Sequence, residues 1–310
     1  MKKFIESHFI YAYANGWKYE FNRIFMRNIF KFLLISIFVT TAAMEANADN
    51  KNAIPAKNEL FFINGSQGKL AARMSLPKLL DGEKCPMVIL SHGFGGNMTY
   101  HLWEPIISIL NENGIGVLRY DFNGCGKSEG KFQNMTVLNE NEDLMSVISY
   151  VRALPVTENI SLVGHSQGGV VTSMVSGDCG SKLIKCEVLL SAAAVLREDA
   201  IRGITQGAHF DPWHLDQPYY ELPRGLKLGR AYIQSAITLP IFETAAKYNG
   251  PALIINGMAD QVVPFTYAQH YNKVLSGSEL VLIPGEDHTY TVAPDYAVKL
   301  VTDWLISKLK

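Results

Sequence analysis

The sequence predicts an α/β fold in which helices cover both faces of a mostly parallel sheet. Short apolar runs alternate with stretches of helical periodicity, and repeated β-α-β units of this kind produce parallel strands. The clearest junction between a strand pattern and a helix pattern is Gly164-His165-Ser166-Gln167-Gly168. A chain of 310 residues, 48% of them hydrophobic, suits one large domain or one domain with an insertion.

Before that junction the chain is expected to form a hairpin and then parallel strands. The segment Asn64-Gly65-Ser66-Gln67-Gly68 is a hairpin turn signal between two alternating runs. Strands are predicted at residues 60–63, 70–74, 87–90, 117–120 and 160–163. Apolar residues three and four positions apart predict helices at residues 102–110 and 137–154.

The regular alternation stops after a further strand predicted at residues 188–190. From Val195 to Tyr248 the chain is rich in aromatic and turn residues. A stretch this long inside a domain predicts an inserted subdomain at about residues 195–248 rather than a loop. Beyond it, strands are predicted at residues 252–255 and 280–283, and helices at residues 268–275 and 296–309.

The first 48 residues differ from the rest of the chain. Met26 to Ala48 has a basic start, an apolar core from Phe32 to Val39 that is too short to span a bilayer, and Ala46-Asn47-Ala48 before a cleavage point. We interpret it as a signal peptide that leaves a mature domain at residues 49–310. Residues 1–25 precede its Met start and are interpreted as an over-called translation start.

Cleavage predicts a periplasmic or secreted protein with no stable membrane association. The rival interpretation is an uncleaved N-terminal anchor.

An exported protein permits disulfides, and Cys179 and Cys186 are close enough in sequence to pair. Free, mostly buried thiols are at least as compatible with the four cysteines, and none of them has a metal-ligand pattern. The net charge of −1 and the lack of a long Lys/Arg run argue against nucleic acid as the main partner.

The strand-to-helix junction carries the pattern G-x-S-x-G around Ser166. A strand that turns at once into a helix forces the central residue into a strained backbone conformation. The residues two before and two after it must lack side chains, because helix and strand pass close together there. Ser166 would then stand at the carboxyl end of the sheet, beside a helix N-terminus that favours developing negative charge. The alternative is a Gly-rich turn that only packs a helix on a strand.

Two further residues at predicted strand ends complete a catalytic set. A serine hydroxyl needs a base, and histidine suits that task near neutral pH. His288 follows a strand directly, and Asp260 lies beyond the preceding one, which gives the chain order Ser, Asp, His. Asp287 is the rival acid, but an adjacent residue usually points away from its neighbour. Asp121 precedes the serine and is expected to cap a turn at Gly124 to Ser128 instead.

The loop His92-Gly93-Phe94-Gly95-Gly96 follows the strand at residues 87–90. Attack on a carbonyl builds an oxyanion, which needs preorganised N–H donors. We expect the backbone N–H groups of Phe94 and Gln167 to supply them. The alternative is a flexible Gly-rich loop, and a phosphate-binding role is disfavoured because no Gly-Lys-Ser/Thr follows. His92 and His165 are expected to flank the site in structural or substrate-shaping roles.

At these residues the chain resembles the α/β-hydrolase superfamily, and more narrowly the bacterial cinnamoyl (feruloyl) esterases. The stretches that carry the resemblance are His92 to Asn97, Arg119 to Ser128, Asn134 to Asp143, Val163 to Val171, Leu239 to Glu243 and Pro251 to Pro264. The resemblance implies an α/β-hydrolase fold with a small cap at residues 195–248 over the serine. It also implies an esterase that releases hydroxycinnamic acids, such as ferulic acid, from plant cell-wall esters, with no metal or organic cofactor.

In this family, polar cap residues hold the phenolic end of the substrate. By position, Asp199, Gln206 and Tyr232 match that set, and Trp213 would be an aromatic wall. The expected partner is therefore a small aryl ester, and the oligomeric state stays open, a homodimer included. The alternatives are a short-acyl carboxylesterase, a thioesterase or an exopeptidase on the same fold, and, from another class, a non-catalytic binding protein that kept the fold.

Overall fold

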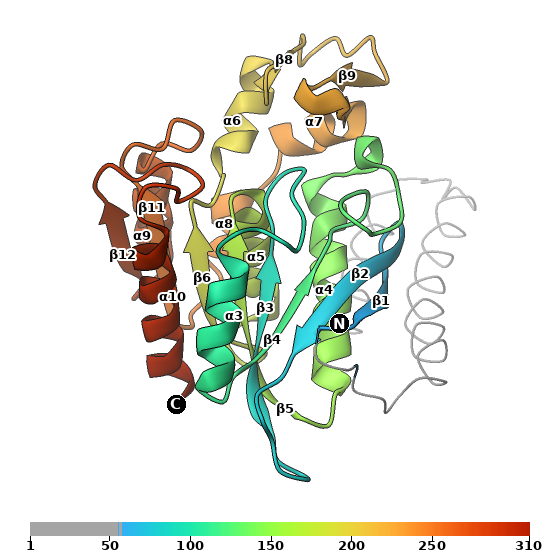
Figure 1. Cartoon of the computed structure of the whole chain (residues 1–310). Helices are drawn as coiled ribbons and strands as arrows, with labels where there is room; N and C mark the ends of the chain where they lie inside the picture. The colour runs from blue at the N-terminus through green and yellow to red at the C-terminus, as the bar shows by residue number, and fades with distance from the viewer. Residues whose placement is uncertain (1–54, 56–57) are drawn as a thin grey trace, which may run out of the picture. The chain divides into compact units, whose positions relative to one another are not determined.

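An eight-stranded sheet organises the structure, a computed structural model that describes residue 55 and residues 58–310 (Figure 1). The strand order is β1-β2-β4-β3-β5-β6-β11-β12. The strands are β1 (Leu60–Gly65), β2 (Gly68–Ser75), β3 (Cys85–Ser91), β4 (Gly116–Tyr120), β5 (Thr157–His165), β6 (Ile184–Leu190), β11 (Ala252–Gly257) and β12 (Glu279–Ile283). The predicted signal peptide, Met26 to Ala48, and residues 1–48 as a whole lie outside the described residues.

Only the first two pairings of the sheet are antiparallel. β1 pairs with β2 through the predicted hairpin, in which Gly65 lies opposite Gly68, and β2 pairs antiparallel with β4. All other neighbours in the sheet are parallel. The mostly parallel sheet that the alternating pattern predicts is therefore confirmed, with every predicted strand present and extended by one to four residues at one or both ends.

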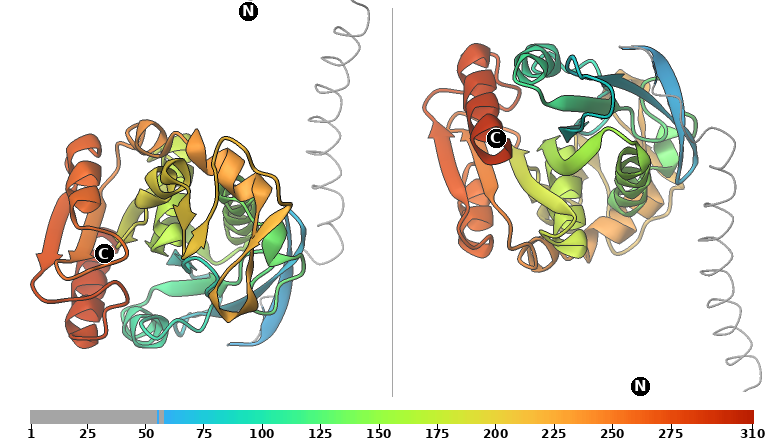
Figure 2. Two further views of the ribbon diagram at one scale, coloured as in Figure 1. Left: turned by 90° about the horizontal axis from the view of Figure 1, so that it is seen from above. Right: turned by 90° about the horizontal axis from the view of Figure 1, so that it is seen from below.

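Helices cover both faces of this sheet, as Figure 2 shows from above and below. They are α3 (Trp103–Glu112), α4 (Val137–Ala153), α5 (Gln167–Cys179), α9 (Thr266–Val274) and α10 (Pro294–Leu309), with a 3-10 turn, η2, at Phe132–Asn134. Successive strand side chains point to opposite faces. In β3, Val88 and Leu90 pack against α3 and α10, whereas Ile89 packs in the larger core with α4, α5 and α9. Two apolar layers thus form from one sheet.

The inserted segment after β6 contains most of the irregular structure. Its elements are α6 (Val195–Arg202), β7 (Ile204–Thr205), β8 (Ala208–His209), β9 (Tyr219–Glu221), η3 (Pro223–Gly225), β10 (Lys227–Gly229), α7 (Arg230–Ile237) and α8 (Ile241–Ala245). α6, α7 and the two small hairpins lie above the carboxyl ends of the central strands (Figure 1). α8 instead packs on α5, where Gly177 has no room for a Cβ beside the Thr244 carbonyl oxygen. The cap therefore ends before α8.

The four cysteines are free thiols, so the Cys179–Cys186 disulfide left open by their spacing is absent. Sheet geometry explains this. The Cys186 side chain lies in the apolar layer under α3 and α10, while Cys179, at the end of α5, packs against the layer on the opposite face. The sheet separates the two sulfur atoms.

In the part of the chain that the structure describes, none of the helices combines the length and the apolar character needed to cross a membrane.

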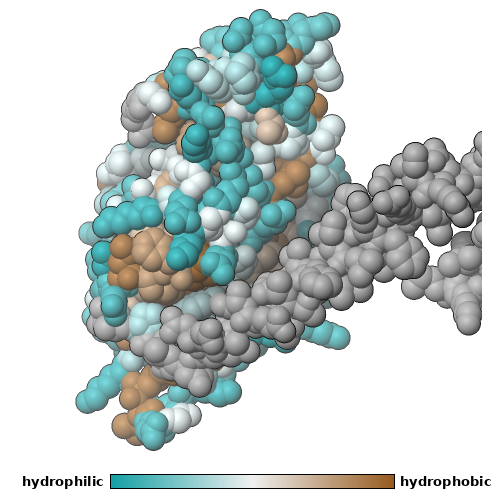
Figure 3. All heavy atoms as spheres, turned by 90° about the vertical axis from the view of Figure 1, so that its right-hand side faces the viewer, coloured by the Kyte–Doolittle hydropathy of each residue, from teal (hydrophilic) through white to brown (hydrophobic). Residues whose placement is uncertain are grey.

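Exposed apolar side chains on β1 and α4 include Phe62, Leu138 and Met145. Figure 3 shows the face on this side of the molecule, where an apolar patch interrupts a mostly hydrophilic surface.

Candidate active site

Ser166 lies at the turn between β5 and α5 with a φ of 55° and a ψ of −122°. Such backbone strain in a residue other than glycine costs on the order of 1–3 kcal/mol and persists only where the surroundings enforce it. Here β5 lies in the middle of the sheet and α5 is buried along most of its length. The fold therefore holds Ser166 in the strained turn that the G-x-S-x-G pattern predicts.

The glycines of this turn are required by close backbone approach. A Cβ on Gly164 would lie 2.2 Å from the carbonyl oxygen of Gly168. A Cβ on Gly168 would lie 2.3 Å from the carbonyl oxygen of His92. Both distances are far below van der Waals contact, so helix α5 could not start this close to β5 and to the loop after β3 if either residue carried a side chain.

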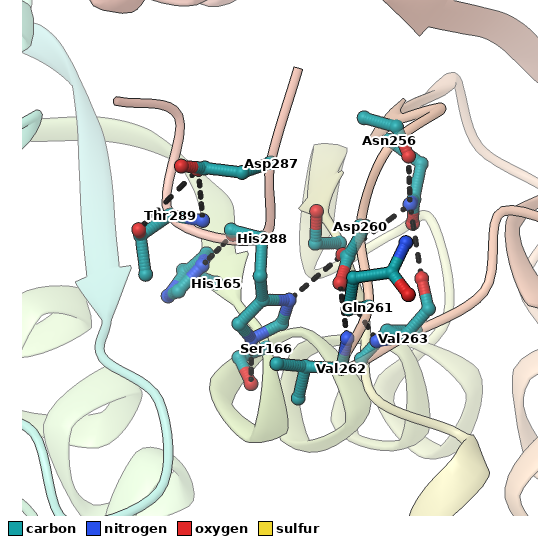
Figure 4. A network of polar contacts seen from close by, with 12 residues as sticks. His165, Ser166, Asn256, Asp260, Gln261, Val262, Val263, Asp287, His288 and Thr289 are labelled. Atoms are coloured by element: carbon teal, nitrogen blue, oxygen red, sulfur yellow. Dashed lines mark hydrogen bonds and ion pairs between the residues drawn. The ribbon is translucent and has the colours of Figure 1, made fainter. Parts of the chain in front are cut away.

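The structure brings together the three residues that the chain order singled out (Figure 4). His288 Nε2 lies 3.0 Å from Ser166 Oγ, and His288 Nδ1 lies 2.8 Å from Asp260 Oδ2. An ionised carboxylate only accepts hydrogen bonds, so Nδ1 carries the proton and donates it to Asp260. His288 Nε2 is then the free acceptor that faces the serine hydroxyl, which is the arrangement a general base needs.

Asp260 is oriented by the backbone that follows it. Its Oδ1 accepts hydrogen bonds from the N–H groups of Val262 and Val263, both at 2.8 Å. Its side chain is fully buried, and Asn256 approaches the other oxygen, Oδ2, at 3.5 Å. The two N–H donors occupy one carboxylate oxygen and leave the other for His288, so the carboxylate holds the imidazole in a single orientation.

Asp287, the rival acid, turns away from the serine (Figure 4). Its carboxylate accepts hydrogen bonds from the N–H groups of Thr289 and Thr291. Glu286, which is fully buried, accepts hydrogen bonds from the N–H groups of Asp287, Val292 and Ala293. Both acids thus brace the loop that carries His288, a role for Glu286 that the sequence analysis missed.

His165 is buried beside the catalytic set and supports its base. Its Nε2–H donates to the backbone carbonyl oxygen of His288 at 2.9 Å, and its ring stacks on Tyr100 with centroids 4.5 Å apart. Burial, reinforced by the nearby His288, lowers the pKa of His165 to about 3. A neutral ring that is buried and bonded to the backbone supports the loop of His288, and a substrate-shaping role for His165 stays a prediction.

His92 is buried as well, and backbone groups occupy both of its ring nitrogens. Nδ1–H donates to the Gly93 carbonyl oxygen at 2.8 Å, and Nε2 accepts from the Phe122 N–H at 3.0 Å. Burial lowers its pKa, so the ring stays neutral. His92 therefore holds the shape of the loop that carries Phe94, and a substrate-shaping role for it stays a prediction.

The two expected oxyanion donors come from different elements. A Cβ on Gly93 would lie 2.9 Å from the Ser166 Cβ, so the loop after β3 contacts the nucleophile directly. Within the described residues, the Phe94 N–H donates to no other backbone group. Gln167 is the first residue of α5, where N–H groups lack partners inside the helix. Both N–H groups are available to an oxyanion; that they bind one stays a prediction.

The four cap residues expected to bind substrate occupy different environments. Asp199 is half-buried, and burial raises the pKa of its carboxyl, an effect that Arg202 opposes. Gln206 is exposed, at the turn between β7 and β8 with a φ of 51°. Trp213 is 69% exposed and lines a surface hollow together with Arg230 and Gln234 of α7.

Tyr232 is the only one of the four that reaches the catalytic machinery in the described structure. It is 1% exposed, and its hydroxyl donates to the Gln167 side-chain oxygen at 2.8 Å. Gln234 lies two positions further along α7, on the opposite face of that helix. The hollow beside Trp213 therefore lies on the other side of α7 from this contact. Substrate binding by these cap residues stays a prediction.

A family model and solved structures of known proteins are similar to this chain. The family model described as "Serine aminopeptidase, S33" matches residues 82–215, which include Ser166. The structure of Est1E from Butyrivibrio proteoclasticus with ferulic acid bound superposes with a TM-score of 0.76 and 31% identity, over 80% of this chain and 98% of that one. The chain belongs to the α/β serine hydrolases.

Curated proteins of different description are also similar to the chain. The uncharacterized protein YfhR of Escherichia coli K12 is 28% identical over 202 residues, 65% of this chain and 62% of YfhR, so the chain spans about 62% of that relative. Human palmitoyl-protein thioesterase ABHD10, mitochondrial, is 25% identical over 273 residues, 82% of either protein.

Proposed function

We propose that this α/β serine hydrolase cleaves carboxylic esters through an acyl-enzyme at Ser166. The 3.0 Å contact between Ser166 Oγ and His288 Nε2, with Asp260 at the far side of the imidazole, is the observation that carries the proposal. A base positioned on a serine hydroxyl beside a helix N-terminus serves nucleophilic attack on a carbonyl carbon and has no comparable use in a binding protein.

The reaction follows from the geometry. Ser166 Oγ attacks the ester carbonyl carbon while His288 Nε2 takes its proton, and the Phe94 and Gln167 N–H groups hold the oxyanion. The imidazolium, stabilised by Asp260, returns its proton to the leaving alcohol and leaves an acyl-serine. Water then attacks the acyl carbon with His288 again as base, which releases the acid and restores the serine.

As the substrate we propose esters of hydroxycinnamic acids, such as ferulic esters from plant cell walls. The similarity to Est1E, which was solved with ferulic acid bound, supports this choice. Asp199 supports it further, because a half-buried carboxyl group at the cap can accept a hydrogen bond from a phenol. A second candidate is thioester hydrolysis, which the similarity to ABHD10 favours.

A panel of purified-enzyme assays separates these candidates. Methyl ferulate, p-nitrophenyl butyrate, a palmitoyl thioester and an aminoacyl anilide represent the feruloyl, short-acyl, thioesterase and exopeptidase alternatives. We expect the highest kcat/KM on methyl ferulate, and Ser166→Ala should abolish turnover of every substrate. A residual rate within about tenfold of the wild type would overturn the mechanism. A preference for the thioester would retain the mechanism and replace the substrate.

We further propose that Met26 to Ala48 is cleaved on export, so that the enzyme acts in the periplasm or outside the cell. The apolar core of this segment and the small residues that follow it support the proposal. Mass spectrometry of the protein recovered from its native host should find Asp49 at the N-terminus. A full-length product in the membrane fraction would support an uncleaved anchor instead.

A further inference from the structure

Tyr232 connects the cap to the residue that follows the nucleophile. It lies in α7 and is 1% exposed, and its hydroxyl donates to Gln167 Oε1 at 2.8 Å. Gln167 is itself buried, and its backbone N–H is one of the two expected oxyanion donors. Tyr232 of the cap thus holds the side chain of Gln167, and the backbone N–H of Gln167 must point at the reacting oxygen.

The other end of the Gln167 amide is held by the core. Its Nε2 donates to Glu140 Oε2 at 2.8 Å, and Glu140 is a buried residue of α4. A side-chain amide that donates at one end and accepts at the other has a single orientation. Glu140, Gln167 and Tyr232 therefore form a buried chain of hydrogen bonds from α4 through the start of α5 to α7.

The ring of Tyr232 contacts the second expected donor residue. The Phe94 ring lies edge-on to Tyr232, with centroids 5.7 Å apart and an interplanar angle of 79°. Phe132 of η2 packs edge-on against Phe94 as well, with centroids 5.1 Å apart. The hydroxyl of one tyrosine thus holds Gln167 while its ring packs on Phe94.

We propose that Tyr232 is a positioning residue for the oxyanion hole, and that it holds the N–H groups of Phe94 and Gln167 in place from the cap side. The proposal rests on the esterase mechanism above. It differs from the substrate-binding role that the family resemblance implies, because the hydroxyl is buried and already committed to Gln167. Oxyanion donors act through preorganisation, so a loosened pair lowers transition-state stabilisation without weakening substrate binding.

Tyr232→Phe tests this proposal with three esters. Methyl ferulate has a phenol, methyl cinnamate has the same acyl chain without it, and p-nitrophenyl acetate has no aryl acyl group. We expect kcat to fall by about tenfold on all three, with KM within about twofold of the wild type. A loss confined to methyl ferulate with a raised KM would show a phenol ligand and overturn the proposal. Unchanged kinetics on all three esters would overturn it as well.

Tyr248→Phe is the matched control. Tyr248 is also 1% exposed, and its hydroxyl donates to the Ile184 carbonyl oxygen at 3.0 Å. Ile184 begins β6, so this contact lies at the end of the sheet opposite the site. The control should lose thermal stability as Tyr232→Phe does, with kcat unchanged. An equal fall of kcat in both variants would show a general packing effect and overturn the proposal.

A second route keeps the test informative if Tyr232→Phe folds poorly. Gln167→Met removes the amide but keeps the backbone N–H and the approximate volume. We expect it to lower kcat by a similar factor, and the double variant with Tyr232→Phe to be no slower than the slower single variant, because both changes break one chain of contacts. An unchanged kcat in Gln167→Met alone would overturn the proposal, as would fully multiplicative effects in the double variant.

The rate of Ser166 labelling by a fluorophosphonate separates this inference from the proposed function. The phosphonyl oxygen uses the same N–H donors, but the reaction needs no carboxylic ester substrate. Labelling that is about tenfold slower in Tyr232→Phe supports the inference even if the wild type hydrolyses none of the esters, which would overturn the proposed function alone. A wild type that is not labelled would overturn both.

Discussion

His165 donates its Nε2–H to the backbone carbonyl oxygen of His288 at 2.9 Å. His165 directly precedes the nucleophile, Ser166. It thus holds the main chain of His288, the base that activates that nucleophile. Tyr100, which stacks on His165, adds a second anchor because its hydroxyl donates to the Thr289 carbonyl oxygen at 2.9 Å. These two side chains therefore help to position the loop of His288, and they bond to its backbone rather than to the serine hydroxyl.

His165→Phe tests this support. Phenylalanine keeps an aromatic ring against Tyr100 but has no N–H for the His288 carbonyl. We expect kcat on p-nitrophenyl acetate to fall by about tenfold, because a misplaced base slows proton transfer. Steady-state kinetics together with a thermal melt would check this. A kcat equal to that of the wild type would show that the loop of His288 needs no such anchor.

Asp260→Asn should lower kcat by about 10⁴-fold. The Val262 and Val263 N–H groups will hold the amide oxygen, which leaves the amide NH₂ facing His288 Nδ1. His288 must then accept at Nδ1 and carry its proton on Nε2, where it cannot take the proton of Ser166. Asp287→Asn is the matched control, and its kcat should stay within about threefold of the wild type because the amide oxygen of the variant can still accept the Thr289 and Thr291 N–H groups. The reverse ranking of the two variants would assign the acid to Asp287.

The burial of Glu187 predicts that folding stability falls as the pH rises from 4.5 to 8. It lies fully buried in β6, and burial raises the pKa of its carboxyl to about 8. Within the described residues neither of its oxygens has a hydrogen-bond partner of normal geometry. The unfolded chain releases this proton near pH 4.5, so between pH 4.5 and 8 the folded state binds more protons than the unfolded one. Folding stability therefore falls as the pH rises through that window, on the order of 1 kcal/mol per pH unit.

Urea unfolding of the wild type and of Glu187→Gln at pH 5, 6.5 and 8 checks this. Glutamine keeps the shape and stays neutral, so the stability of the wild type relative to the variant should decrease steadily across the three conditions. A difference that does not change with pH would mean that Glu187 does not hold its proton in the folded state.

Gly168→Ala should destabilise the fold by about 3 kcal/mol or more, because its Cβ would lie 2.3 Å from the His92 carbonyl oxygen. Gly277→Ala separates this contact from backbone strain. Gly277 has a φ of 76°, but a Cβ added there would meet no atom within 4 Å, so its substitution should cost only about 1 kcal/mol of strain. Chemical denaturation measures both. Equal losses would show that the approach of α5 to the loop after β3 adjusts easily.

The parts of the site that could be predicted are those set by constraints between residues close together in sequence. Gly164 and Gly168 surround Ser166 within one turn, so the constraint on that backbone is local. Asp260 and His288 each follow an apolar strand, and parallel strands place their carboxyl ends at one edge of the sheet. By contrast, the partners of His165 and Gln167 come from other segments, and neither partner is visible in local sequence.

The cap shows the same limit. The break in periodicity after Ala194 predicts an insertion, yet it could not show that α8 belongs with the core or that Tyr232 faces inward while Trp213 faces solvent. Short hairpins such as β7-β8 carry too few residues for a periodic signal, so their faces are set by the elements they pack against.

The sequence by itself determined the alternation of strands and helices, the strained turn at Ser166 and the order of serine, acid and base. These depend on backbone sterics and on the side-chain period of each element, which are properties of neighbouring residues. Only the tertiary structure decided that Cys179 and Cys186 lie on opposite faces of the sheet, that Asp287 turns away, and that the Tyr232 hydroxyl is bonded to Gln167. Those outcomes depend on which distant segments pack together, because the donor and its acceptor meet only after the sheet and the cap have formed.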